Sequence, residues 1–294
     1  MSTLMTHAFS LMNIQSVPSF ALTPAQYGFI GGGTMARSLI GGLLARGAAP
    51  MDIIVSEPNA DLRNALQVDF GVQTTEQNDQ AAALAAIWLI AVKPQVMKTV
   101  CEQLCAIASD RAPLVISIAA GITMSSLQNW LGTQAKVVRA MPNTPALIGE
   151  GVSGLCANAA LSESDRARAA SLLQAVGGTV WIEREELMDA VTATSGSGPA
   201  YFFLLIEAMQ QAAIAQGLSA SAARELVLRT ALGAAKMAFA SDEDAAVLRQ
   251  RVTSPGGTTA AAIAAFEAGG FAAQVANAID QATQHGKTLS AQFG

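Results

Sequence analysis

Hydrophobic and polar positions follow two different rhythms along the chain, and the change falls near residues 183–190. Before it, short runs rich in Ile and Val are bounded by Gly, Pro or Asp, which is typical of buried strands. These runs read YGFIG, DIIVSE, IWLIAV, PLVISIAA, KVVRAM and TVWIE. Segments with helical spacing lie between them, such as MARSLIGGLLARG and QVMKTVCEQLCAIAS. Apolar strands that alternate with helices predict a parallel, doubly wound sheet covered on both faces.

Strand patterns stop at about Leu187, and long helical segments follow. They read AYFFLLIEAMQQAAIAQG, SAARELVLRTALGAAKMAFAS and FAAQVANAIDQATQHGKTLS, with Gly217 and Gly286 as expected terminators or weak points. The first is apolar nearly all round over Tyr201–Gln216, so we expect it to be buried on every side. A second subunit would bury it most easily.

The composition indicates which kinds of partner the protein can have. The chain has 294 residues, of which 51% are hydrophobic and only 13% charged, so its surface is sparsely charged. Apolar helix faces without enough polar residues to cover them suggest burial in an oligomer. A net charge of −5 with no basic stripe argues against nucleic acid or an anionic membrane as a partner. No uninterrupted apolar stretch reaches the length of a transmembrane helix.

The first 26 residues contain no Lys or Arg, and Pro18 interrupts their apolar run. They lack the pattern of a secretory signal, and we expect a poorly ordered extension on a cytoplasmic protein. The three cysteines have no C-x-x-C spacing, which argues against a disulfide framework or a zinc site. Cys101 and Cys105 are one helical turn apart, and we interpret them as buried small apolar side chains rather than a shared reactive site.

A strand, a glycine turn and a helix follow one another directly in YGFIGGGTMARSLIGGLL. Gly31, Gly33 and Ala36 fill the G-x-G-x-x-G/A pattern. The first glycine permits a tight turn, the second lets the backbone approach a pyrophosphate, and the small third residue allows close packing of helix and strand. The pattern predicts a Rossmann-like dinucleotide-binding domain over residues 27–186, followed by an all-helical domain over residues 187–294.

Glu57 ends the next strand, about 20 residues beyond the glycine turn, where an acidic side chain accepts hydrogen bonds from ribose hydroxyls. A 2′-phosphate there would be repelled unless a cation intervened, and Arg63 is about one helical turn away. NADH should therefore at least be tolerated. The alternative is that Glu57 is simply a solvated residue at a strand end.

The stretch VTSPGGTTAAAI places several hydroxyls and two glycines at the start of an alanine-rich helix. A helix N-terminus binds a carboxylate through free amides, and the glycines remove Cβ atoms that would block the approach. Each hydroxyl alone could instead cap the helix. The hydroxyl residues are Thr253, Ser254, Thr258 and Thr259, and the glycines are Gly256 and Gly257.

These motifs occur in series with LIAVKPQ, SIAAGI, RAMPNTPALIGEG and TATSGSGPAYFF, and together they resemble the pyrroline-5-carboxylate reductases over Tyr27 to Ser290. The resemblance implies hydride transfer from NAD(P)H to the imine carbon of 1-pyrroline-5-carboxylate, which gives L-proline in the last step of proline biosynthesis. It also implies that the helical domain forms homodimers, which can stack into rings, and that each active site draws on two chains.

The resemblance also assigns roles to matching residues. Together with Glu57, the residues implied to bind the cofactor are Gly31, Gly32, Gly33, Thr34, Met35, Ala36, Asn78, Ala91, Val92, Lys93, Pro94, Ala119, Ala120, Gly121, Met141, Pro142 and Asn143. The residues implied to hold the substrate carboxylate are Ser254, Gly256, Gly257 and Thr258, with the Thr259 hydroxyl at the ring nitrogen.

Two positions depart from the family pattern. Relatives that favour NADPH commonly carry Ser, Thr or Arg where this chain has Glu57. The segment LRQRV before the substrate loop is unusually basic, and Arg251 either reaches the carboxylate or faces solvent.

The sequence lacks the residue patterns of a histidine proton relay and of a metal site. His7 and His285 are the only histidines and neither is near a motif, so a His–Asp proton relay is not expected. No H-E-x-x-H or clustered ligand pattern predicts a metal. We interpret Glu185, Glu186 and Asp189 as helix N-terminal charges first and ligand contacts second.

Two other functions remain open. A β-hydroxyacid-type dehydrogenase would need a Lys or His in the helical half, where only Lys236 and Lys287 supply an amine. A non-catalytic redox-sensing module would explain the cofactor loop but not the hydroxyl-rich loop.

Overall fold

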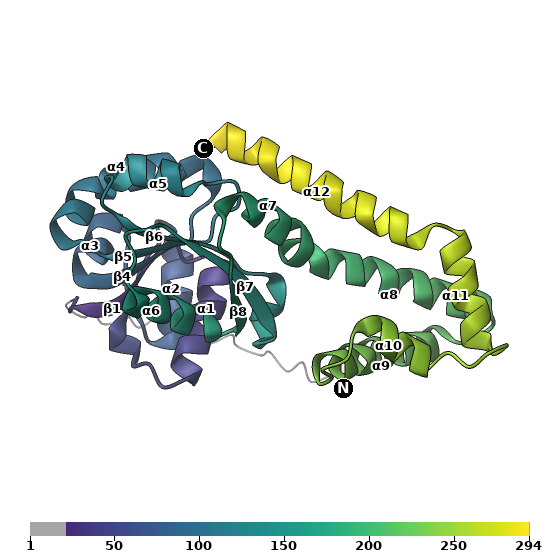
Figure 1. The fold of residues 1–294 in the computed structure, drawn as a ribbon. Helices are drawn as coiled ribbons and strands as arrows, with labels where there is room; N and C mark the ends of the chain where they lie inside the picture. The colour runs from purple at the N-terminus through teal and green to yellow at the C-terminus, as the bar shows by residue number, and fades with distance from the viewer. Residues whose placement is uncertain (1–21, 294) are drawn as a thin grey trace, which may run out of the picture.

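The structure is a computed structural model that describes residues 22–293. A sheet with helices on both faces forms one half, and long helices extend away from it to form the other (Figure 1). The expectation for the first 26 residues falls mostly outside the described range. Thr23, inside that range, donates its backbone N–H to Gln73 Oε1 at 2.7 Å and is tied to the sheet.

One eight-stranded sheet contains every strand of the described chain, in the order β3-β2-β1-β4-β5-β6-β7-β8. The first six positions have the doubly wound order, which reverses between β1 and β4. The carboxyl ends of these two neighbours therefore form a crevice suited to a ligand. The strands are β1 Ala25–Ile30, β2 Ile53–Ser56, β3 Gln73–Thr75, β4 Ala85–Ile90, β5 Leu114–Ser117, β6 Lys136–Met141, β7 Gly151–Ala157 and β8 Gly177–Trp181.

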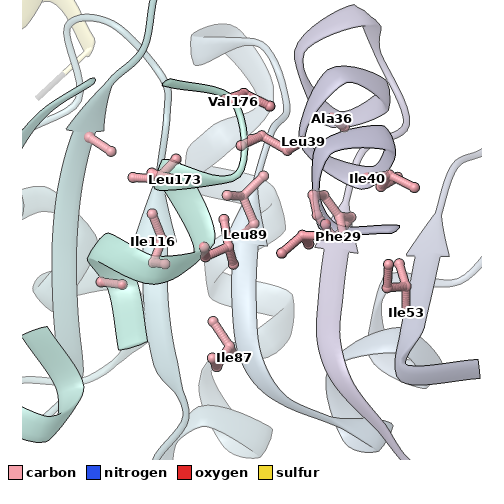
Figure 2. Packing of buried hydrophobic residues seen from close by; sticks show 14 of the residues in the cluster. Phe29, Ala36, Leu39, Ile40, Ile53, Ile87, Leu89, Ile116, Leu173 and Val176 are labelled. Atoms are coloured by element: carbon pink, nitrogen blue, oxygen red, sulfur yellow. The ribbon is translucent and has the colours of Figure 1, made fainter. Parts of the chain in front are cut away.

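The central strands β2, β4 and β5 are largely buried on both faces, as the continuous apolar runs predicted, whereas β8 at the edge is partly exposed. In β1 and β4, successive side chains alternate between two clusters: Phe29 and Leu89 belong to one, Ile30 and Trp88 to the other. Figure 2 shows the first cluster, where α1 lies over the strands. Its helices are α1 Thr34–Ala45, α2 Ala60–Phe70 and α6 Glu163–Gln174, and the opposite face carries α3 Asn78–Leu84, α4 Pro94–Arg111 and α5 Met124–Leu131.

Two strands, β3 and β7, were not predicted from the sequence, and β7 makes the sheet a mixed parallel and antiparallel one. The run QTT of β3 is short and polar, and GVSGLCA of β7 is rich in glycine. The expectation of a wholly parallel sheet is wrong at β7, which pairs antiparallel with β6. The connection over residues 142–150 is too short for a parallel crossover, which needs a dozen or more residues.

The second half is entirely helical, as predicted. After a 3-10 turn at Glu185–Leu187, α7 covers Met188–Val191 and continues through a π-helical turn at Thr192–Gly196. Then α8 leads away from the sheet and α12 returns to it, so that the C-terminus lies beside the sheet half (Figure 1). The remaining helices are α8 Gly198–Ala215, α9 Ala220–Phe239, α10 Ala245–Arg251, α11 Thr258–Ala268 and α12 Phe271–Phe293.

The apolar helix, which we expected to be buried on every side with the help of a second subunit, is not covered within the single chain. In α8, only Gly198 is buried, whereas Phe202 and Phe203 are 68% and 66% exposed. The helix packs mainly against α9 and leaves its other faces uncovered. Gly217 does follow the end of α8, with φ +99°, but Gly286 lies inside α12 and does not end it.

Within the described residues, no single helix is long and apolar enough to cross a membrane. By length and composition alone, α11 and α12 together would pass the same test as a pair bent by 51°.

Candidate functional site

The glycine turn joins β1 to α1 at the crevice where the strand order reverses. Gly31 has φ +102°, and a Cβ there would lie 2.9 Å from the Ala91 carbonyl oxygen, so the turn requires glycine. Gly33 is the N-cap of α1, and a Cβ built on it meets no atom within 4 Å. The backbone is therefore open in front of the helix N-terminus, as pyrophosphate binding requires. Ala36 is fully buried where α1 packs on the sheet.

Glu57 lies beside this turn and is half-buried. Its Oε2 accepts a hydrogen bond from the Gly32 N–H at 3.0 Å, and its Oε1 accepts one from the Asn59 N–H at 3.0 Å. The side chain is therefore held against the glycine turn, and it remains partly exposed to solvent.

Asn78 and Arg63 are close to the same end of β2. The Ser56 hydroxyl donates to Asn78 Oδ1 at 2.8 Å, which places the start of α3 at this edge. The Arg63 guanidinium donates to the carbonyl oxygens of Glu57 and Pro58, at 2.7 and 2.8 Å. Both residues flank the position predicted for the adenosine.

The other segments predicted to bind cofactor follow β4, β5 and β6 at the same edge of the sheet. Ala91 donates its N–H to the Ile30 carbonyl at 2.8 Å, and Pro94 begins α4. Gly121 has φ +76° and packs against the backbone of Leu289 in α12. The structure thus brings these predicted segments together: Ala91, Val92, Lys93 and Pro94; Ala119, Ala120 and Gly121; and Met141, Pro142 and Asn143.

Asn143 joins the sheet to the helical half. Its Nδ2 donates to the Ser195 carbonyl at 3.1 Å, and its Oδ1 accepts from the Val152 N–H at 2.9 Å. A cavity of about 360 Å³ lies beside it, between the end of β6 and the start of α8, and Phe202 and Phe203 line its outer side. The amide of Asn143 therefore fixes one wall of this cavity.

The hydroxyl-rich loop joins α10 to α11. Gly256 has φ +72°, and the Gly257 N–H donates to the Ser254 carbonyl at 3.0 Å. Gly257 itself is the N-cap of α11, and no side chain caps the helix. Capping therefore does not explain the hydroxyls, and the first amides of α11 have no intrahelical partner.

Two residues at the start of this loop, Arg251 and Thr253, have side chains that bond to groups outside it. The Thr253 hydroxyl donates to the Arg249 carbonyl at 2.6 Å, so it closes the end of α10. Arg251 is exposed and pairs with Glu243 at 2.5 Å, which agrees with the solvent-facing alternative for this residue in the single chain.

The structure does not bring the two halves of the predicted site together within one chain. The loop before α11 lies at the end of the helical half that is farthest from the sheet, whereas the glycine turn lies on the sheet (Figure 1). A site that used both the glycine turn and the loop before α11 would therefore have to combine two chains.

A buried ionic cluster was not predicted from the sequence. Arg139, in the interior of β6, pairs with Glu185 at 2.9 Å and with Asp189 at 3.6 Å. Glu185 also accepts from the Met124 N–H at 2.7 Å, and Asp189 Oδ1 accepts from the Ser290 hydroxyl at 3.4 Å. Glu185, Glu186 and Asp189 lie in the first turns of their helices, as predicted, and Glu185 and Asp189 in addition pair with a buried arginine. The only sequence signal was an acidic turn directly before the helical half.

The cysteines have the buried character predicted for them only in part. Cys101 is fully buried and Cys105 is half-buried. Burial, with a smaller contribution from Glu102, raises the pKa of the Cys101 thiol to about 12, so it stays protonated and unreactive near neutral pH. No group of three potential metal ligands occurs among residues 22–293.

A Rossmann-type half with an acidic residue after its second strand, joined to an apolar helical half, places the chain in the class of two-domain nicotinamide-dependent oxidoreductases. The family described as pyrroline-5-carboxylate reductase dimerisation matches residues 185–289. The family described as NADP oxidoreductase coenzyme F420-dependent matches residues 26–121.

Individual relatives narrow the class. The pyrroline-5-carboxylate reductase of Pseudomonas aeruginosa is 50% identical over 266 residues, covering 90% of this chain and 97% of that protein. The enzyme of Haemophilus influenzae is 47% identical over 267 residues, covering 90% and 97%. The chain therefore belongs to the pyrroline-5-carboxylate reductase family.

Solved structures agree with this assignment. A pyrroline-5-carboxylate reductase from Coxiella burnetii has a TM-score of 0.88 at 41% identity, covering 91% of this chain and 99% of that one. The Plasmodium falciparum pyrroline carboxylate reductase with NADP bound has a TM-score of 0.80 at 29% identity, covering 92% and 100%.

Proposed function

We propose that this chain reduces the imine carbon of 1-pyrroline-5-carboxylate with hydride from NAD(P)H, giving L-proline in the last step of proline biosynthesis. The observation that carries the proposal is the pairing of an open glycine turn with a second, uncapped helix N-terminus at α11, in a chain of this family. One helix start suits a pyrophosphate and the other a carboxylate.

The cofactor is proposed to lie along the carboxyl edge of the sheet. The amides after Gly31 would bind the pyrophosphate, and Gly33 leaves the room for it. Glu57 and Asn78 flank the adenosine side, whereas Gly121 and Met141 lie at the nicotinamide side.

The substrate carboxylate is proposed to bind at the start of α11. There Ser254 supplies a hydroxyl, and Gly257 and Thr258 supply backbone amides aligned with the helix dipole. No buried cation is needed. Thr259, one residue further, would place its hydroxyl at the ring nitrogen.

The reaction requires the protein mainly to orient the imine and the nicotinamide relative to each other. An imine protonated at nitrogen is already electrophilic at the carbon that accepts hydride, and the bound nicotinamide supplies that hydride. Orienting two bound molecules contributes on the order of 7–11 kcal/mol to lowering the barrier. The Thr259 hydroxyl is too weak an acid to supply the proton alone, so it hydrogen-bonds a nitrogen that is protonated by solvent or before binding.

The assembly is proposed to be a homodimer formed through the helical half, with dimers able to stack into a ring. Exposed apolar side chains support it, since Phe202, Phe203 and Leu204 lie together on α8 and Phe239 at the end of α9 is 96% exposed. A partner chain that covers them would also carry its own loop before α11 to this chain's cofactor edge. The free thiols of all three cysteines support a reducing, cytoplasmic location.

No observation favours the β-hydroxyacid-type dehydrogenase. Lys236 is exposed on α9 and His285 is exposed on α12, so neither is held in a site by its own chain.

Turnover tests the proposed function directly. The full-length enzyme, mixed with 1-pyrroline-5-carboxylate and NADH or NADPH, should oxidise the nicotinamide and form proline, followed by absorbance and by amino-acid analysis. Oxidation without proline, or no oxidation with either nucleotide, would overturn the substrate assignment.

Replacing the hydroxyl at the ring nitrogen should slow turnover. We expect Thr259→Val to lower kcat/KM for the imine by about 10- to 100-fold, because one hydrogen bond to a desolvated nitrogen is lost. Thr259→Ser, which keeps the hydroxyl, should retain most activity. Thr253→Val is a matched control in the same loop, because that hydroxyl bonds the Arg249 carbonyl. Equal losses in Thr259→Val and Thr253→Val would contradict the assigned role.

A further inference from the structure

The carboxylate at the end of β2 is held in place before any nucleotide binds. Glu57 receives one backbone N–H on each oxygen, from Gly32 in the phosphate turn and from Asn59 in the following loop. A carboxylate has about four acceptor positions, so both oxygens keep capacity for further donors. The geometry thus presents a fixed, negatively charged acceptor beside the first amides of the turn.

The nearest cation is already engaged. Arg63 donates to the carbonyl oxygens of Glu57 and Pro58, and its other terminal nitrogen lies 3.7 Å from Glu76 Oε2. A phosphate at this edge would therefore meet two carboxylates and an arginine whose Nη1 already donates to the main chain.

The other usual anion site at this edge is closed as well. The N-terminus of α2 follows β2 directly, and Asn59 caps it by accepting from the N–H groups of Asp61 and Leu62 at 2.9 and 3.2 Å. Asp61 adds a further negative charge in the first turn. The amides that could otherwise bind a phosphate are thus satisfied by the chain itself.

The two nicotinamide cofactors differ only at the 2′ position of the adenosine ribose. NADH has a hydroxyl there, which can donate to a carboxylate, whereas NADPH has a phosphate that carries a charge of about −1.5 to −2. We infer that this enzyme selects NADH over NADPH and that Glu57 is the residue that sets the selection. The inference rests on the proposed use of a nicotinamide cofactor.

Binding measured without the imine substrate tests it. The dissociation constants of NADH and NADPH for the full-length enzyme, followed by nucleotide fluorescence, should differ by at least about tenfold in favour of NADH. Because the penalty for NADPH is a repulsion between charges, raising the salt concentration should narrow the difference. Glu57→Gln should tighten NADPH binding by about tenfold and weaken NADH by only a few-fold, since the amide keeps one acceptor oxygen.

Glu102→Gln is the matched control, because it removes the charge of an exposed carboxylate that lies on α4, pairs with Lys98 and is not at the end of β2. This control should change the ratio of the NADPH and NADH dissociation constants much less than Glu57→Gln does. Equal or tighter binding of NADPH by the unmodified enzyme, or a ratio that Glu57→Gln leaves unchanged, would overturn the inference. Selective NADH binding by an enzyme that does not turn over the imine would uphold the inference and overturn the proposed function instead.

Discussion

Two variants that are inactive alone should regain activity when their chains are combined in one oligomer. Gly33→Asp places a carboxylate where the pyrophosphate is expected, and a Cβ at this position meets no atom within 4 Å, so the fold should tolerate it. Gly257→Asp places a carboxylate at the N-cap of α11, where Asp is a favoured capping residue and would occupy the amides meant for the substrate. Each variant alone should lose at least about 100-fold in kcat/KM.

The recovery follows from the distance between the two loops within one chain. If each site combines the cofactor edge of one chain with the α11 loop of its partner, a mixed dimer has one site free of both substitutions. Random mixing of the two chains should then restore about a quarter of the unmodified activity, and a purified mixed dimer about half. The measurement is the specific activity of co-expressed chains carrying two different affinity tags. Gly33→Asp paired with a differently tagged copy of itself should stay inactive. An inactive mixed dimer would show that each site belongs to one chain.

Replacing the buried Arg139 side chain should lower the free energy of unfolding substantially. Arg139→Met leaves the half-buried Glu185 and Asp189 without their cation, and removing one partner of a buried pair costs up to about 3–5 kcal/mol in the free energy of unfolding. Urea denaturation followed by circular dichroism measures this loss. Lys98→Met is the control, because Lys98 and Glu102 form an exposed pair on α4, and it should change stability by no more than about 0.5 kcal/mol. A loss in Arg139→Met as small as that of the control would show that the cluster contributes little.

The sequence predicted those strands and helices whose pattern of apolar residues along the chain matches the burial of these residues in the fold. The strand at residues 136–141 was placed correctly because Val137 and Val138 are both buried, one on each face. The strand β7 was missed because glycines interrupt it, and its Gly154 is needed where a Cβ would lie 2.5 Å from Val191. Such a requirement comes from the neighbouring segment and leaves no periodic signal.

The same reasoning applies to the candidate site. The glycine turn was predictable because its residues are consecutive and each has a backbone reason to be there. The Arg139 cluster was not, because Arg139 and its partner Glu185 are 46 residues apart in sequence, and Asp189 and Ser290 are 101 residues apart. The spacing of the motifs did not show the separation of the α11 loop from the glycine turn, and only the family resemblance implied a site shared by two chains.

The return of α12 to the sheet has a consequence for how the protein is made. A Cβ on Gly121 would lie 3.3 Å from Leu289, so the turn after β5 packs against α12. During synthesis the sheet half leaves the ribosome before α12 does and can collapse early. The edge of the sheet at Gly121, however, is complete only once α12 has been made and has packed against it. Newly made chains therefore acquire a folded sheet before they acquire a complete binding surface.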